Sequence, residues 1–321
     1  MLSHMEVFNK YIMPATIETL AVMVQKFNAA SNGAIRLTTE GFEGDFLQES
    51  FFAAIHGAQR RVNRYGSNDD QAATDLTQLK RSSVKVAGGF GPILFEPGQM
   101  TWLNKPTAEG VEVASRNFAE ALMQDQLFTA IAALVAAIEN NTSVVNDVSA
   151  TAGISYTALN SAHAKFGDHS GSLIANVMTG EVMHKLIGQN LTNATRLFEA
   201  QNVNVVDILG KAVIVTDAPA LFETGSPNKQ KVLGLVDSAA VVHDGGDLIS
   251  NIQTSNGKER IETTMQVDYT FGLGLKGYTW DEANGGKSPT DADLATGANW
   301  DKVMTSDKHT AGVIAVGDST K

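Results

Sequence analysis

The chain has no cysteine among its 321 residues. This absence excludes a disulfide framework, a thiolate metal site and a cysteine nucleophile. The N-terminal residues lack the basic start and the apolar run of a signal peptide. The longest apolar run, about 12 residues long, is shorter than the ~20 residues that span a bilayer. We therefore expect the protein to be made and kept in a cytoplasm, with no membrane partner.

Positive charge is scarce as well, with 24 basic against 35 acidic residues and a net charge of −11. A protein that grips nucleic acid usually has a basic face, and this composition does not indicate one. Residues 34–105 contain eight basic and eight acidic side chains, so the rest of the chain carries the whole negative excess. The locally basic segment can attract an acidic surface of another copy, although ordinary surface variation explains the pattern equally well. The candidates for such contacts are Arg60, Arg61, Arg64, Lys80, Arg81 and Lys85.

A long helix is predicted from Thr107 to Glu139, a stretch without proline. Its apolar residues recur three or four positions apart, which is the spacing of one helix face. Thr129 is the single polar residue between Leu127 and Ile138, so this half should be buried nearly all round. Such a helix is roughly 50 Å long at about 1.5 Å per residue. That length suits a subunit of a shell better than a compact enzyme domain.

Residues 40–100 are rich in glycine and poor in apolar residues. We expect a short helix within 46–61, a strand at 83–87 and a turn at Pro97-Gly98. The apolar content is too thin for an independent core. The segment is therefore interpreted as a protruding arm or hairpin that finds its contacts on neighbouring molecules, because loops of this length are uncommon inside compact domains.

The remaining segments predict an α/β unit and one long strand. Residues 265–275 alternate strictly between apolar and polar, which is the strongest strand signal in the chain. Helices are expected at 14–33, 156–166 and 179–189. Further strands are expected at 34–38, 173–178, 203–208, 212–215, 232–236, 239–242 and 311–316, with a linker at 140–149.

No catalytic, cofactor-binding or metal-binding residue is predicted. The spelling Gly272-x-Gly274-x-x-Gly277 matches a dinucleotide-binding motif, but the glycines lie in a strand and no helix follows them. The histidines show no metal-binding spacing, and no Gly-x-Ser-x-Gly turn is present. Asp168, Asp207 and Asp217 are better explained as turn and strand-end residues than as a carboxylate cluster.

Several stretches resemble the major capsid proteins of tailed bacteriophages, which have the HK-ninety-seven-like fold. Residues 158–168, 173–188 and 209–221 are similar to that family's apical domain, in which a helix ends in Gly-Asp and a strand ends in Asp-x-Pro. Residues 285–303 and 309–316 are similar to its closing segment. The resemblance is collinear over nearly the whole chain.

The resemblance implies an α+β fold with an N-terminal arm at 1–33 and an extended loop with its flanks at 34–104. It implies a peripheral domain at 105–149 and 232–280, which holds the spine helix 107–139 and long β-strands. The apical α/β domain would occupy 150–231, and a C-terminal closing segment 281–321.

The function implied is that of a virion head protein, not an enzyme and without cofactors. Copies would self-assemble as hexamers and pentamers into an icosahedral shell around double-stranded DNA, bound without sequence specificity, in the cytoplasm of a bacterial host. Portal and decoration proteins would be further partners, and scaffolding would be either supplied by a separate protein or absent. The alternatives are an encapsulin-like nanocompartment shell with protein cargo and, less favoured, a cytosolic α/β enzyme or ligand-binding protein.

Overall fold

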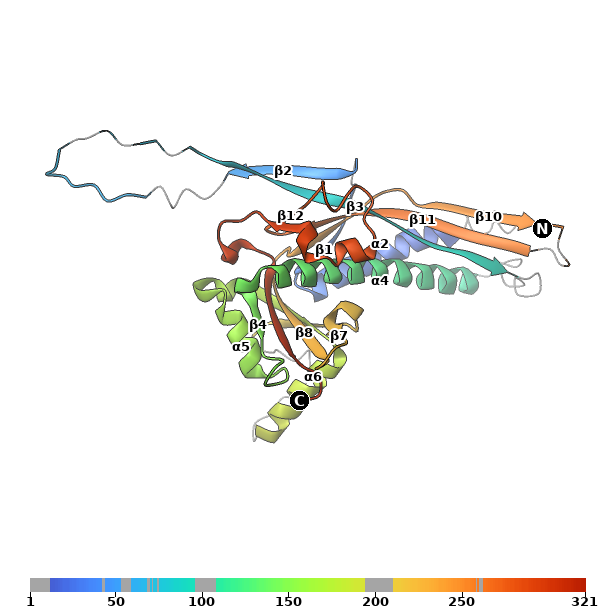
Figure 1. Cartoon of the computed structure of the whole chain (residues 1–321). Helices are drawn as coiled ribbons and strands as arrows, with labels where there is room; N and C mark the ends of the chain where they lie inside the picture. Colours follow the sequence, from blue (N-terminus) through green and yellow to red (C-terminus); the bar gives the residue numbers. More distant parts are fainter. Residues whose placement is uncertain are drawn as a thin grey trace.

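The computed structural model describes residues 12–41, 44–52, 59–67, 70, 72–73, 75–95, 108–193, 210–257, 259 and 262–321. Helix α4 (Ala108–Asn140) runs through the middle of the molecule, with one six-stranded sheet above it and another below it (Figure 1). It confirms the predicted spine helix within one residue at each end. Thr107, the first residue of the predicted helix, lies outside the described residues.

The first sheet has the strand order β1-β9-β11-β3-β2, and β10 pairs with the outer half of β11. Strand β11 alternates as predicted, with Met265, Val267, Tyr269, Phe271 and Leu273 all buried. The strands are β1 (Ile35–Gly41), β2 (Phe46–Phe52), β3 (Gln78–Phe95), β9 (Ala240–Asp244), β10 (Ile249–Ser255) and β11 (Glu262–Leu275).

The second sheet has the order β4-β14-β8-β5-β6, with the short β7 paired to β8. It combines strands from distant parts of the sequence, since β14 near the C-terminus lies between β4 and β8. Its strands are β4 (Val145–Asp147), β5 (Leu173–Met178), β6 (Ala212–Val215), β7 (Phe222–Glu223), β8 (Lys229–Val236) and β14 (Gly312–Asp318). Strand β4 lies within the stretch expected as a linker.

Helix α2 (Met13–Ala30) packs beside α4, and α5 (Tyr156–Ala164) and α6 (Gly180–Asn193) flank the second sheet. Pro14 stands in the first turn of α2, as expected, because its missing N–H has no helical partner there. A small sheet of β12 (Tyr278–Trp280) and β13 (Trp300–Lys302) and the short helix α7 (Asp291–Leu294) complete the fold. The strand expected at 203–208 lies outside the described residues.

In the extended segment, one local prediction is wrong and another is confirmed but too short. The short helix expected within 46–61 is wrong: Phe46–Phe52 is strand β2, paired antiparallel with β3. The strand expected at 83–87 is part of β3, which is 18 residues long. Pairing with β11 overrides the local glycines. At Gly88 a Cβ atom would approach the Tyr269 ring to 2.8 Å, so the glycine makes room for that ring.

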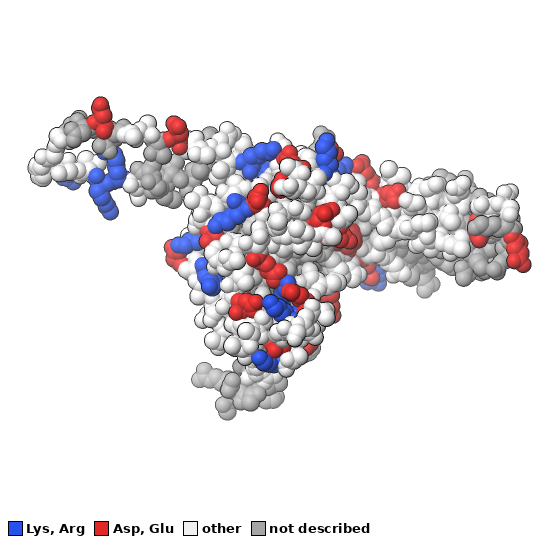
Figure 2. Space-filling model, in the orientation of Figure 1, with Lys and Arg blue, Asp and Glu red and all other residues white. Residues whose placement is uncertain are grey.

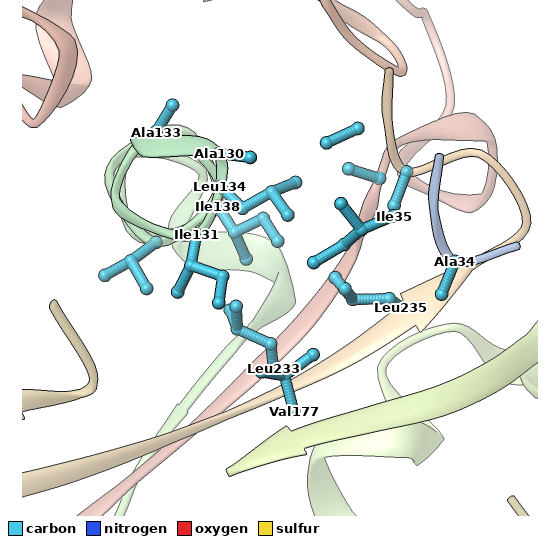
Figure 3. Packing of buried hydrophobic residues seen from close by; sticks show 14 of the residues in the cluster. Ala34, Ile35, Ala130, Ile131, Ala133, Leu134, Ile138, Val177, Leu233 and Leu235 are labelled. Atoms are coloured by element: carbon cyan, nitrogen blue, oxygen red, sulfur yellow. The ribbon is translucent and has the colours of Figure 1, made fainter. Parts of the chain in front are cut away.

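One hydrophobic core joins α4 to both sheets. Leu134 and Ile138 of α4 point toward Ile35 of the first sheet, and Ile131 points toward Leu233 of the second (Figure 3). All of these side chains are fully buried. The segment Ser115–Asn140 is long and apolar enough to cross a membrane by length and composition alone, but this is weak evidence, because the core helix of a globular protein passes the same test.

Truncation of Leu134 to alanine should reduce the free energy of unfolding by about 2–5 kcal/mol, because a cavity remains where the side chain contacted the core. Ala133→Pro should be more severe, since proline removes a backbone donor in the middle of α4 and clashes with the preceding turn. Denaturant titration of the unassembled subunit measures both effects. Gln124→Ala, at an exposed position of the same helix, is the control and should change stability by less than about 0.5 kcal/mol. A soluble, native Ala133→Pro subunit would contradict the continuous buried helix.

Candidate assembly surface

Strands β2 and β3 form a ribbon that leaves the body of the protein and continues into the connection between them (Figure 1). At about 3.3 Å per residue, β3 alone extends roughly 60 Å. Every side chain described between residues 59 and 77 is exposed, and Tyr65 is 97% exposed. Exposed large side chains that gather on one segment mark an interaction surface. The ribbon is therefore the part of the subunit best placed to contact another molecule.

The six basic residues singled out in the sequence fall into two groups. Arg60, Arg61 and Arg64 lie in the exposed connection, and no ion pair joins them to another described residue. The other three, Lys80, Arg81 and Lys85, lie on β3 where the ribbon meets the body, and each pairs within the same chain. Basic and acidic side chains are both present on the ribbon and on the body (Figure 2).

Lys80 and Lys85 of the inner group attach the ribbon to the body, and Arg81 joins its two strands. The Glu282 carboxylate accepts hydrogen bonds from Ser82 Oγ at 2.6 Å and Lys80 Nζ at 2.9 Å. These bonds, first that of Ser82 and then that of Lys80, hold the pKa of Glu282 below its ordinary value. Lys85 Nζ lies 2.9 Å from Asp247, and Arg81 lies 2.5 Å from Glu49 on β2. Each exposed pair contributes only about 0–1 kcal/mol, so together they orient the ribbon more than they stabilise the fold.

Lys231 is a functional candidate that the sequence analysis missed. Its side chain on β8 is only 8% exposed and lies 2.8 Å from Glu139 in the last turn of α4 and 2.9 Å from Glu223 on β7. Burial lowers the pKa of Lys231, but the hydrogen bonds to the two carboxylates outweigh it and raise the pKa overall. The triad connects the end of α4 to the second sheet. In the sequence, Lys231 stands directly before the apolar run of the strand predicted at 232–236. This position could have identified it as a buried lysine with a charged partner, because buried lysines are almost always paired.

The motifs that suggested chemistry have structural roles. Gly272 and Gly274 lie inside β11 and Gly277 lies in the turn to β12, so no helix N-terminus faces them. Within the part of the chain that the structure describes, no group of three His, Asp or Glu side chains is arranged to hold a metal ion.

The carboxylates and the buried histidine are likewise engaged in local contacts. Asp168 pairs with Lys308, and Asp217 accepts a hydrogen bond from the Gly180 N–H at 3.2 Å. Asp207 lies outside the described residues. His163 is buried beside Asn176, with Nε2 3.0 Å from Oδ1, and burial lowers its pKa.

Comparison with known proteins decides the identity of the fold. Residues 4–314 match the Gp13-like family, described as major capsid protein 13-like. The chain belongs to this family of major capsid proteins. It builds the head shell of a tailed phage and is a structural protein of the virion capsid, not an enzyme.

Solved capsid structures show the same fold at low sequence identity. The Cyanophage Pam1 capsid asymmetric unit is 12% identical with a TM-score of 0.53, and the match covers 89% of this chain and 88% of that one. Microbacterium phage Oxtober96 is 12% identical with a TM-score of 0.52, covering 90% of each chain. Mycobacterium phage Adephagia is 11% identical with a TM-score of 0.50, covering 90% and 88%. No curated protein matches the sequence of this major capsid protein.

Replacing Lys231 with methionine should lower the free energy of unfolding of the subunit by about 1–3 kcal/mol, because two carboxylates lose a charged hydrogen-bond donor. The difference in the free energy of unfolding between the wild type and the variant should be smaller at low pH. The pKa of Glu223 is lowered in the folded protein from about 4.5, so its contribution is present above that pH and is lost as the pH falls through the folded pKa.

Denaturant titrations at pH 7 and pH 3.5 measure both effects. Lys229→Met is the matched control, since Lys229 is 30% exposed and pairs with Asp147 at 3.3 Å, so its loss should cost at most about 1 kcal/mol. Equal losses for the two variants, or a deficit at Lys231 that does not depend on pH, would argue against the triad.

Proposed function

We propose that this head-shell protein assembles as hexamers and pentamers that close into an icosahedral capsid around double-stranded DNA. The observation that carries the proposal is the ribbon of β2 and β3, whose outer part has only exposed side chains among the described residues. A segment that buries nothing in its own subunit gains stability by contact with a neighbour. Repeated over a closed shell, each ribbon would lie on the adjacent copy and link the subunits in a ring.

The two bodies of the subunit have different proposed places in the shell. Helix α4 and strands β9, β10 and β11 of the first sheet fall within the proposed peripheral domain, 105–149 and 232–280, which would supply the broad wall of the shell. Strands β5, β6 and β7 of the second sheet fall within the proposed apical domain, 150–231, which would gather around the axis of each hexamer and pentamer. The arm 1–33, the loop 34–104 and the closing segment 281–321 complete this division.

The remaining partners follow from the same proposal. DNA would be enclosed without sequence-specific binding, and the net charge of −11 suits a wall from which packaged DNA must stay free. A portal, a separate scaffolding protein and decoration proteins are further proposed partners, and assembly would take place in the cytoplasm of the bacterial host. Negative-stain microscopy tests the central claim: discrete monomers, or shells that retain protein cargo as in an encapsulin-like compartment, would overturn it.

Removing the tip of the ribbon should abolish shells and spare the subunit. Residues 66–77 are replaced by a short glycine-serine linker, which leaves β2 and β3 unchanged. The variant should stay soluble, with the wild-type circular dichroism and denaturation midpoint, but should sediment as free subunits or small oligomers. Normal shells from the shortened protein would show that the tip is not needed for assembly.

The outer arginines should contribute through charge. Arg60→Glu combined with Arg64→Glu should destabilise shells most at low salt, where charges on neighbouring copies are least screened. Shell dissociation is followed by light scattering from 50 mM to 500 mM NaCl. Lys165→Glu, a reversal at an exposed site on the second body, is the control. If the double variant dissociates like the control at every salt concentration, the arginines do not pair between subunits.

A further inference from the structure

The open edges of the two large sheets are protected in different ways. An unprotected edge strand presents unpaired N–H and C=O groups and pairs readily with another chain, so proteins normally cover it, shorten it, charge it or interrupt it. The edge at β1 is covered by α2: Asn28 Nδ2 donates to the Leu37 carbonyl at 2.7 Å, and the Leu37 N–H donates to Asn28 Oδ1 at 3.0 Å. In the second sheet the edge strands β4, β6 and β7 are at most four residues long.

The edges of the ribbon are protected as well. Strand β2 carries the charged Glu49, which pairs with Arg81. The part of β3 beyond β2 is interrupted by Pro92, which lacks an N–H, and by Gly91 with a φ of +101°. The register with β11 shifts at this point, as in a β-bulge. Charge, proline and bulge are all devices that prevent edge-to-edge pairing.

Strand β10 has none of these devices. It is seven residues long, Ile249–Ser255, contains no charged residue and no proline, and pairs with β11 without a register shift. No second strand pairs with it in the part of the chain that the structure describes. The side chains of Asn251, Gln253 and Ser255 are exposed. Strand β10 lies at the end of the first sheet that is opposite the ribbon tip (Figure 1).

We propose that β10 pairs with β10 of a second copy, in an antiparallel arrangement across a two-fold axis. The proposal rests on the shell-building function and names one of its contacts. A strand that pairs with β10 must itself have a free edge. Among the described strands, the long edge without protection is that of β10 itself. Two-fold contacts join identical patches and are the commonest symmetric interfaces. A neutral strand can pair with its own copy without electrostatic repulsion, whereas identical charges on two copies of a charged strand would repel each other.

The register follows from the positions of the exposed side chains of Asn251, Gln253 and Ser255. With Gln253 on the axis, Asn251 of one copy lies opposite Ser255 of the other, and all five residues are paired. Added strands of this kind gain affinity from main-chain hydrogen bonds, with side chains setting the register. The first sheet would then continue from one subunit into the next. The ribbon tip is at the other end of the molecule, so β10 offers a contact separate from that of the ribbon (Figure 1).

The absence of native cysteine makes this pairing directly testable. Directly opposite residues in antiparallel strands have Cα atoms about 4.5–5.5 Å apart, a separation that a disulfide spans. Full-length shells carrying Gln253→Cys should therefore give covalent dimers on mild oxidation. Asn251→Cys and Ser255→Cys are matched controls that should each remain monomeric, and the double variant Asn251→Cys/Ser255→Cys should dimerise. Hydrogen exchange should show slower exchange of the 251–255 amides in wild-type shells than in free subunits.

Three outcomes are decisive. Dimers from Gln253→Cys and from the double variant, but not from the single controls, support the pairing and its register. Closed shells without any of these dimers overturn it and leave the shell function intact. Slower exchange of 251–255 without cross-links also overturns it, because some other segment must then cover β10. Failure of the wild-type chain to form shells would instead overturn the proposed function.

Discussion

The apolar half of α4 must be buried, and the arrangement of the whole subunit follows from this constraint. A helix with almost no polar residue from Leu127 to Ile138 cannot leave either side in water. The protein covers it with a sheet on each side and with α2 along its flank. Because one helix belongs to the core of both bodies, the two sheets are held in a fixed relation by hydrophobic contact. The Lys231 triad adds a charged link at the end of the same helix.

What remains outside this core has the features of an assembly unit. The ribbon is anchored by ion pairs where it leaves the body, and its outer residues contact little else among the described part of the subunit. Folding and assembly can therefore depend on different parts of the chain. The subunit folds around α4, and the segments that bury no surface within the subunit are available for contact with neighbours. The same reasoning applies to the open edge of β10. In the proposed shell, another copy would cover each of these surfaces.

The family to which the chain belongs consists of structural capsid proteins, and the polar groups described here have structural roles. Asp168, Asp217 and the buried His163 are held by local hydrogen bonds and ion pairs. Lys80, Arg81 and Lys85 show how position changes the meaning of a charged residue. In the sequence they resemble Arg60 and its neighbours, yet they fasten the ribbon to its own subunit.

The sequence by itself determined the elements whose pattern is local. The spacing of apolar residues predicted α4, and strict alternation predicted β11, because a period of 3.6 or 2 leaves one face to bury. Only the tertiary structure decided the rest. Residues 46–52 become a strand, and β3 runs through three glycines, because each has a long partner strand that supplies its hydrogen bonds. The place of β14 between β4 and β8, and the burial of Lys231 between Glu139 and Glu223, join residues far apart in the chain, and no local pattern encodes such contacts.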